Sequence, residues 1–259
     1  APQNIKDGKD DRQMQGFYEK GPDAQLGYTF PSLLTEYVMK NTHIPVGPWR
    51  GVNTNQNGIF MECFMDECAK AAGKDPVQFR RALMQNHPKH LGVLNAVAKK
   101  AEWDKPLPAG TYRGVAQFMG YASYSACVAE VTVQNNVVKV NRLVFALDAG
   151  HIVNPYLARE QIEGSVAMAL GAIFLPEITV EKGRIKQQNL DTYPLLKLSS
   201  TPRIETVLVS TYDFWGGVGE PTICVVGPAV ANAISAAIGR PVRNFPLSKD
   251  CLLYTSPSP

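Results

Sequence analysis

The amino-acid sequence predicts an α+β fold in which mixed sheets and β-hairpins pack against helices. Apolar side chains recur at helical spacing between residues 59 and 101, and the pattern changes to alternation after the loop at residues 106–110. An alanine-rich apolar run at residues 226–238 then returns to helical spacing. The 259 residues are 45% hydrophobic and 19% charged, which is enough to bury a substantial core in one or two globular domains.

The first hundred residues are expected to be largely helical. Residues 1–25 are polar and read as a loop, and residues 33–39 have the composition of a strand. A helix is expected from residue 59 to 72, and its apolar side chains lie on one face that we expect in the core. They are Phe60, Cys63, Phe64, Cys68 and Ala71.

Two further helices follow in this part of the chain. Asp75 and Pro76 supply an N-cap and a proline at the first helical position, which predicts a helix to about residue 85. A third helix is expected at residues 91–101.

The later part of the chain carries signals for hairpins. Alternation at residues 127–133, followed by Asn135-Asn136 and a strand to residue 147, predicts a β-hairpin. An apolar helix begins near Pro155, and Glu181-Lys182-Gly183 is the expected turn of a second hairpin. A strand at residues 204–211 and the helix of residues 226–238, which stops at Gly239, complete the series.

Charge and cysteine content exclude several classes of partner. The 26 basic residues are scattered and exceed the 23 acidic residues by only three, so neither a nucleic-acid partner nor an anionic membrane surface is implied. The sequence has no long apolar run, so no membrane span is expected. Five cysteines show no paired C-x-x-C spacing, which argues against a zinc or iron–sulfur site in this chain. The sequence also lacks an H-E-x-x-H motif, a G-x-S-x-G elbow and a Walker-type glycine loop.

The main candidate for chemistry is Glu220, which ends the glycine loop Gly216-Gly217-Val218-Gly219 and precedes Pro221. Three glycines in four positions allow close approach of the backbone and positive φ angles. A carboxylate that is partly desolvated there has a raised pKa and suits a general base. The alternative is a plain glycine turn whose glutamate faces solvent or forms a salt bridge.

Two other polar side chains are candidates for ligand binding. Arg50 and Gly51 lie in a loop of prolines and glycines, which can present the guanidinium to an anion, or Trp49 can fill the core while Arg50 is exposed. Gln161 lies early on a helix, where its amide can hold an oxo group or a pterin edge, although a helix glutamine is usually a surface residue.

Six motifs occur in an order that closely resembles the C-terminal part of the molybdopterin-binding subunit of the xanthine oxidase family. The resemblance spans about residues 29–247, and the nearest branch is the isoquinoline 1-oxidoreductase β subunit and related aldehyde dehydrogenases. The motifs are Trp49-Arg50-Gly51, residues 61–67, Asp148-Ala149-Gly150 with Asn154-Pro155, residues 161–164, residues 189–194 and residues 216–221.

The resemblance implies a hydroxylase in which Glu220 deprotonates a Mo–OH group and hydride passes to a molybdenum-bound sulfur. Gln161, Arg50 and Gly51, with the loop residues Gly217, Val218 and Gly219, then contact the cofactor. The implied cofactor is molybdenum–molybdopterin, as the cytosine dinucleotide, held by its pterin dithiolene and not by side chains. The implied partners are a small-molecule substrate, a small subunit that carries both [2Fe–2S] clusters, and a cytochrome c as electron acceptor.

Some residues depart from the family pattern. Ala149 stands where the family usually has cysteine, Ser165 and Ala169 where it often has glycine, and Gln117 where this branch commonly has histidine. These departures bear on pocket shape and substrate, and they leave the proposed base unchanged.

Four regions are expected along the chain. Residues 1–28 form an incomplete N-terminal loop region, residues 29–105 the helical part of a molybdopterin-binding region and residues 106–247 its α+β part, while residues 248–259 read as an artefactual or disordered tail. Because family subunits are much longer, we expect a fragment that is inactive alone, and its periplasmic or cytoplasmic location stays open. The alternative function is a cofactor-free binding or assembly module.

Overall fold

The structure is a computed structural model that describes residues 11–17, 23, 26–38, 47–175, 177–247 and 253–254. Among these residues, short 3₁₀ helices occur at Asp11–Met14 and Leu198–Ser200. The α-helices are α1 (Thr54–Ala71), α2 (Pro76–Leu83), α3 (Pro88–Lys100), α4 (Pro155–Phe174) and α5 (Ile223–Ile238). The strands are β1 (Thr111–Gly120), β2 (Ser123–Gln134), β3 (Val137–Asp148), β4 (Val180–Glu181), β5 (Arg184–Ile185), β6 (Arg203–Val209) and β7 (Leu253–Tyr254).

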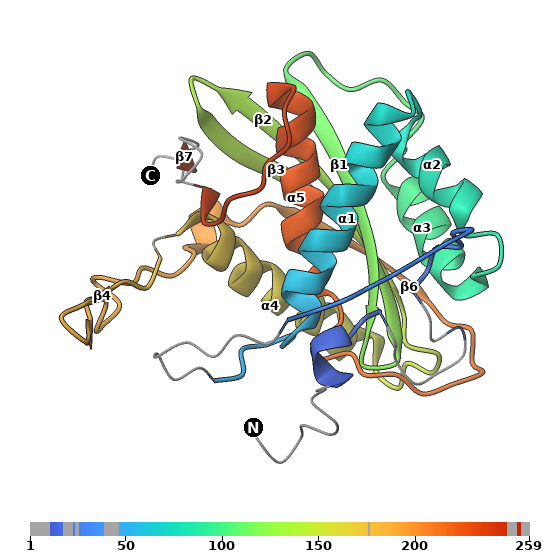
Figure 1. The fold of residues 1–259 in the computed structure, drawn as a ribbon, viewed down its shortest axis with the longest axis horizontal. Helices are drawn as coiled ribbons and strands as arrows, with labels where there is room; N and C mark the ends of the chain where they lie inside the picture. The colour runs from blue at the N-terminus through green and yellow to red at the C-terminus, as the bar shows by residue number, and fades with distance from the viewer. Residues whose placement is uncertain are drawn as a thin grey trace.

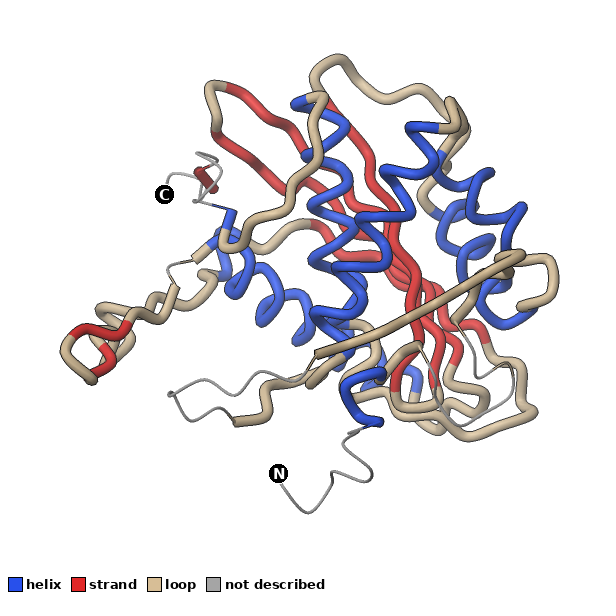
Figure 2. Tube along the Cα trace, in the orientation of Figure 1, coloured by secondary structure: helices blue, strands red, loops and turns tan. Residues whose placement is uncertain are grey.

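A mixed sheet forms the centre of the molecule, with the strand order β1-β2-β3-β6 (Figures 1 and 2). The pairs β1–β2 and β2–β3 are antiparallel, whereas β6 and the short β7 both pair with β3 in parallel. The hairpin β4–β5 extends away from this body in Figure 1. The prediction of an α+β fold with mixed sheets, hairpins and packed helices is therefore confirmed.

Both faces of the sheet are buried, and each face packs against different helices. The side chains of α4 and α5 pack on one face, where Phe118, Phe145 and Leu147 are fully or almost fully buried. Those of α3 pack on the other face, beside Val144 and Ala146. α1 packs against α5 and β1, so the helical part of the chain shares its cores with the α+β part.

Most of the predicted elements occur where the sequence placed them. Asp75 caps α2 by accepting hydrogen bonds from the amides of Val77 and Gln78, both at 2.9 Å. Asn135 and Asn136, with φ angles of 50° and 61°, form the tight turn between β2 and β3. α5 ends at Gly239, which adopts a left-handed conformation with a φ of 75°.

Two predictions about the first part of the chain are wrong. Residues 33–38 belong to no strand, and residue 39 lies outside the described residues. Leu33, Leu34 and Thr35 line a cavity together with side chains of α1. The face of α1 that we expected in the core is also turned outward, since Phe60 and Phe64 are 67% and 61% exposed. The polar residue Glu62 occupies the buried side instead.

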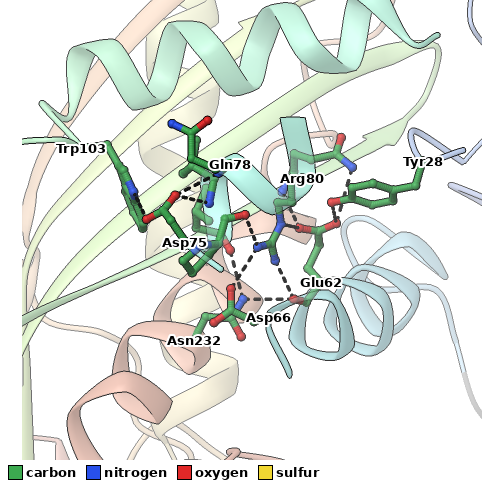
Figure 3. A network of polar contacts seen from close by, with 12 residues as sticks. Tyr28, Glu62, Asp66, Asp75, Gln78, Arg80, Trp103 and Asn232 are labelled. Carbon is green, nitrogen blue, oxygen red and sulfur yellow. Dashed lines mark hydrogen bonds and ion pairs between the residues drawn. The ribbon is translucent and has the colours of Figure 1, made fainter. Parts of the chain in front are cut away.

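A buried polar network explains this orientation of α1 (Figure 3). Glu62 and Arg80 are both completely buried and form an ion pair of 3.0 Å. Glu62 also accepts hydrogen bonds from the hydroxyl of Tyr28 (2.6 Å) and from the backbone amide of Gln117 (3.0 Å). Arg80 donates a further hydrogen bond to Asp66 (3.0 Å). Because each of these groups would be costly to bury without a partner, the network fixes which side of α1 faces inward.

The network also perturbs the ionisation of its members. Burial raises the pKa of Glu62, an effect that the neighbouring Arg80 charge partly offsets. The pKa of Tyr28 is raised well above its ordinary value by burial and by the Glu62 carboxylate. Gln117, which the family resemblance places near the pocket, belongs to this network, and its Oε1 atom accepts a hydrogen bond of 2.7 Å from Nδ1 of His90.

None of the helices in the described ranges combines the length and apolar character needed to cross a membrane. In the expected tail, residues 253–254 pair with the start of β3, and the other residues from 248 onward lie outside the described residues.

Candidate functional site

The glycine loop before Glu220 is held by the turn between β1 and β2. The amide of Gly217 donates to the carbonyl of Tyr121 (2.9 Å), and the hydroxyl of Ser123 donates to the carbonyl of Gly217 (2.6 Å). On its other side, the amide of Gly216 donates to the carbonyl of Ala149 (3.0 Å). The loop is therefore hydrogen-bonded to the β1–β2 turn and to the residue that follows β3.

Gly216 in this loop is needed for space and not for a positive φ angle. None of Gly216, Gly217 and Gly219 has a positive φ angle, which corrects that expectation. A Cβ atom at Gly216 would lie 2.1 Å from Oγ of Ser123 and 2.5 Å from the carbonyl oxygen of Ala122. The loop packs so closely on the β1–β2 turn that only glycine fits at this position.

The substitution Gly216→Ala is expected to destabilise the fold by about 2 kcal/mol, since the added methyl group would have to displace backbone atoms of the turn. Thermal unfolding measures this loss. The matched control is Gly92→Ala within α3, where a Cβ meets nothing within 4 Å. That change should stabilise the helix by about 0.5–1 kcal/mol. Equal effects of the two substitutions would contradict the proposed contact.

Glu220 is partly buried and meets the loop that contains Arg50. The backbone amide of Gly51 donates to Oε1 of Glu220 at 3.0 Å, across 169 residues of sequence. Within the described part of the chain, Glu220 takes part in no ion pair within 4.0 Å, so the salt-bridge alternative is not what the structure shows. Pro221 and Thr222 then lead directly into α5, as predicted for a loop that feeds a buried helix.

Arg50 joins the acidic loop to the helix that carries Gln161. Its Nε atom donates to the carbonyl of Gly219 (2.7 Å), and its Nη2 atom donates to both the carbonyl (2.9 Å) and Oε1 (3.1 Å) of Gln161. Burial lowers the pKa of Arg50, and the nearby Glu220 charge partly offsets this effect. The guanidinium of Arg50 thus connects the Glu220 loop to the Gln161 helix. Trp49 is 42% exposed, so the alternative in which it fills the core is not what the structure shows.

The Arg50 loop adopts an unusual backbone conformation. Gly51 and Val52 have φ angles of 90° and 43°, and the second value is rare for a β-branched residue. A hydrogen bond of 2.7 Å from the Val52 amide to the carbonyl of Trp49 closes the turn. Such strain is characteristic of loops held in one geometry for function.

A cavity of about 480 Å³ opens beside these groups. Gln161, Gly216, Val218 and Gly219 are among the residues that line it. His151 and Trp215 also line it, and their rings are stacked with centroids 4.3 Å apart and an interplanar angle of 16°. The cavity therefore offers polar amide groups together with a flat aromatic wall.

The structure brings most of the candidate residues together. Arg50, Gly51, Gln161, Gly219 and Glu220 form one connected set. Val218 lines the cavity, whereas the backbone polar groups of Gly217 point to the β1–β2 turn and away from it.

Sequence reasoning missed several residues of the site. The aromatic pair His151 and Trp215 carries no distinctive spacing, and the hydroxyl groups of Ser123, Ser125 and Ser165 belong to a residue type found everywhere in proteins. The two-residue turn at residues 121 and 122 was also missed, because Tyr and Ala are not the residues that positive φ angles favour. The one available signal was Asn154-Pro155, since Asn154 caps α4 with bonds to two backbone amides.

In this α+β domain, hydrogen bonds join Glu220 to Gly51 and Arg50 to Gly219 and Gln161, and Gln161 and Gly219 also line the cavity. Over residues 64–202 the chain matches the family described as the molybdopterin cofactor-binding domain, and it belongs to that family. The resemblance to molybdopterin-binding subunits of the xanthine oxidase family is confirmed. Of the candidate site residues, only Gln161 lies within the matched range.

Several known proteins are similar to this chain. It is 29% identical to the isoquinoline 1-oxidoreductase subunit beta of Brevundimonas diminuta, over 86% of this chain and 29% of that protein. It is 32% identical to the membrane-bound aldehyde dehydrogenase [pyrroloquinoline-quinone] of Gluconacetobacter polyoxogenes, over 76% of this chain and 28% of that protein. The chain thus spans less than a third of the length of these relatives.

A solved structure has a similar fold. Quinoline 2-oxidoreductase from Pseudomonas putida 86 matches with a TM-score of 0.66 and 13% identity, over 75% of this chain and 50% of that chain. The chain therefore shares its fold with part of that protein.

Proposed function

We propose that the complete protein containing this chain is a molybdenum hydroxylase or dehydrogenase that oxidises an N-heterocyclic aromatic compound or an aldehyde with oxygen derived from water. The proposal is supported by the hydrogen bonds that bring Glu220, Gly51, Arg50 and Gln161 together, next to a cavity that Gln161 lines. The two substrate classes follow from the names of the relatives.

The residues of the site fit a molybdenum–pterin group. The cavity combines backbone and side-chain amides with a flat aromatic wall, which suits a planar ring system rich in hydrogen-bonding groups. In the described part of the chain, no group of three or more His, Cys, Asp or Glu could hold a metal ion. A metal held by a pterin, and not by side chains, is compatible with this set of residues.

Gln161, Val218 and Gly219 would hold the cofactor, with Arg50 and Gly51 beside them. Because Oε1 of Gln161 accepts from Arg50, the side-chain NH₂ group remains as the donor for a bound ligand. When bound, the cofactor supplies the redox chemistry. We infer the cytosine dinucleotide form, and a separate subunit with [2Fe–2S] clusters that receives the electrons and passes them to a cytochrome c.

Glu220 acts as the general base in this proposal. The Gly51 amide fixes Oε1, so the carboxylate is held in one orientation and Oε2 can accept the proton that is removed during turnover. Arg50 keeps Gly219, the residue before the base, at a fixed distance from the helix of Gln161. The protein thus supplies a positioned base and an oriented binding site.

Metal and pterin analysis of the full-length subunit, purified with its partner, tests the proposal. We expect about one molybdenum and one pterin per chain, because the proposed site holds a single metal that is bound by a single pterin. A full-length protein that folds and assembles with neither group would instead be a cofactor-free binding or assembly module.

A further inference from the structure

We propose that Ser165 and Thr222 are positioning residues, whose buried hydroxyl groups fix the Glu220 loop against the Gln161 helix. The hydroxyl of Thr222 donates to Oγ of Ser165 at 3.0 Å. Ser165 in turn donates to the carbonyl of Ile162 at 2.6 Å. The inference rests on the proposed function, since it concerns how the proposed base and the cofactor-contacting glutamine are held.

The direction of this chain of hydrogen bonds follows from the groups involved. The carbonyl of Ile162 can only accept, so the single hydroxyl proton of Ser165 is used there. The Oγ atom of Ser165 must therefore accept the hydrogen bond that the Thr222 hydroxyl donates. Both side chains are completely buried, so water does not compete for either bond.

Thr222 occupies a position where its hydroxyl would ordinarily have another use. It is the N-cap residue of α5, where threonine commonly bonds a backbone amide of its own helix, yet no such bond is formed. The hydroxyl reaches across to α4 instead. Thr222 therefore does not cap α5 with its side chain, and its hydroxyl instead links α5 to α4.

The two ends of this link are next to the two halves of the site. Ile162 follows Gln161 on α4, and Thr222 lies two residues after Glu220. The amide of Ile223 also donates to the carbonyl of Glu220 at 3.2 Å, which joins the base to the first turn of α5. A movement of either helix that broke the hydroxyl pair would change the separation of Glu220 from Gln161.

A second buried hydroxyl supports the same loop from the sheet. Ser125 on β2 donates to the carbonyl of Pro221 at 3.0 Å and to that of Phe118 at 3.2 Å. Pro221 is therefore held from β2 while Thr222 is held from α4. The Ser165–Thr222 pair is the element of this support that reaches the helix of Gln161.

The test is the substitution Thr222→Val, which removes the hydroxyl and keeps the shape of the side chain. In the chain without cofactor, amide hydrogen exchange at Ile223 should become at least about fivefold faster, because the loop opens more readily. In the full-length loaded protein, kcat should fall about tenfold with KM within about twofold and with unchanged molybdenum content. Thr222→Ser keeps the hydroxyl, so its exchange rate at Ile223 and its kcat should both stay near those of the unsubstituted protein.

The control is Ser235→Ala, farther along α5. The Ser235 hydroxyl donates to Ala231 (2.7 Å) and accepts from the amide of Val242 (3.0 Å), so its loss also removes hydrogen bonds from this helix. It should lower Tm without faster exchange at Ile223 and without loss of kcat. If Thr222→Val behaves like this control, or speeds exchange while kcat is unchanged, the positioning role is wrong. The exchange measurement needs no cofactor and remains informative even if the proposed function fails.

Discussion

Replacing Glu220 with glutamine is expected to lower the turnover of the full-length, molybdenum-loaded protein at least about a hundredfold. The glutamine carbonyl can still accept the hydrogen bond from the Gly51 amide, so the loop keeps its geometry. The neutral amide cannot accept a proton, and the base is lost without a change in shape. Steady-state kinetics of the purified variant, together with its molybdenum content, measures the effect.

The control for this prediction is Glu163→Gln. Glu163 is an exposed glutamate on α4, two residues after Gln161, and it takes no part in the proposed site. Its substitution should leave turnover and molybdenum content unchanged. Near-normal turnover of Glu220→Gln at full molybdenum content would exclude Glu220 as the general base. Low molybdenum content in that variant would show that the carboxylate serves to hold the cofactor.

The helices and hairpins that follow local rules could be predicted from the sequence. α2 follows from the Asp75-Pro76 cap, and the β2–β3 turn follows from two consecutive asparagines that tolerate positive φ. α4 and α5 follow from long apolar runs with helical spacing. In each case the decisive information lies within a few residues of the element itself.

The orientation of α1 could not be predicted in this way. The apolar stripe of α1 indicates a buried face, yet Phe60 and Phe64 are exposed. The reason is that Glu62, on the side of α1 that faces the core, bonds to Arg80 and Tyr28. Tyr28 is 34 residues away and Arg80 is 18 residues away. A buried ion pair depends on such distant partners, and no periodicity in the helix reports them.

The candidate site has the same limitation. Glu220, Gly51 and Gln161 were recognised because ordered motifs resemble a known family, while their contacts join segments 111 and 169 residues apart. The sequence marks Ser165 only as a departure from a family glycine, and its hydroxyl contact with Thr222 could not be predicted because it depends on the packing of α4 against α5. Motif order can therefore nominate a base, but the groups that position it emerge only from the fold.

The ion pair of Glu62 and Arg80 is expected to give the second large effect. The substitution Glu62→Ala should destabilise the fold by about 3–5 kcal/mol, because it leaves a fully buried guanidinium without its main partner. For a chain of this size such a loss lowers Tm by roughly 10 °C. Chemical and thermal unfolding of the chain measure both quantities.

A double-mutant cycle separates the ion pair from the rest of the network. Arg80→Met alone should also be strongly destabilising, because it leaves the Glu62 carboxylate buried with only the neutral donors Tyr28, Gln117 and its remaining neighbours. The double variant Glu62→Ala with Arg80→Met should lose clearly less than the sum of the two single losses. The exposed pair of Glu102 and Lys105 provides the control, since Glu102→Ala should leave Tm unchanged. Strict additivity of the two buried substitutions would mean that α1 is oriented by its other packing contacts and not by this ion pair.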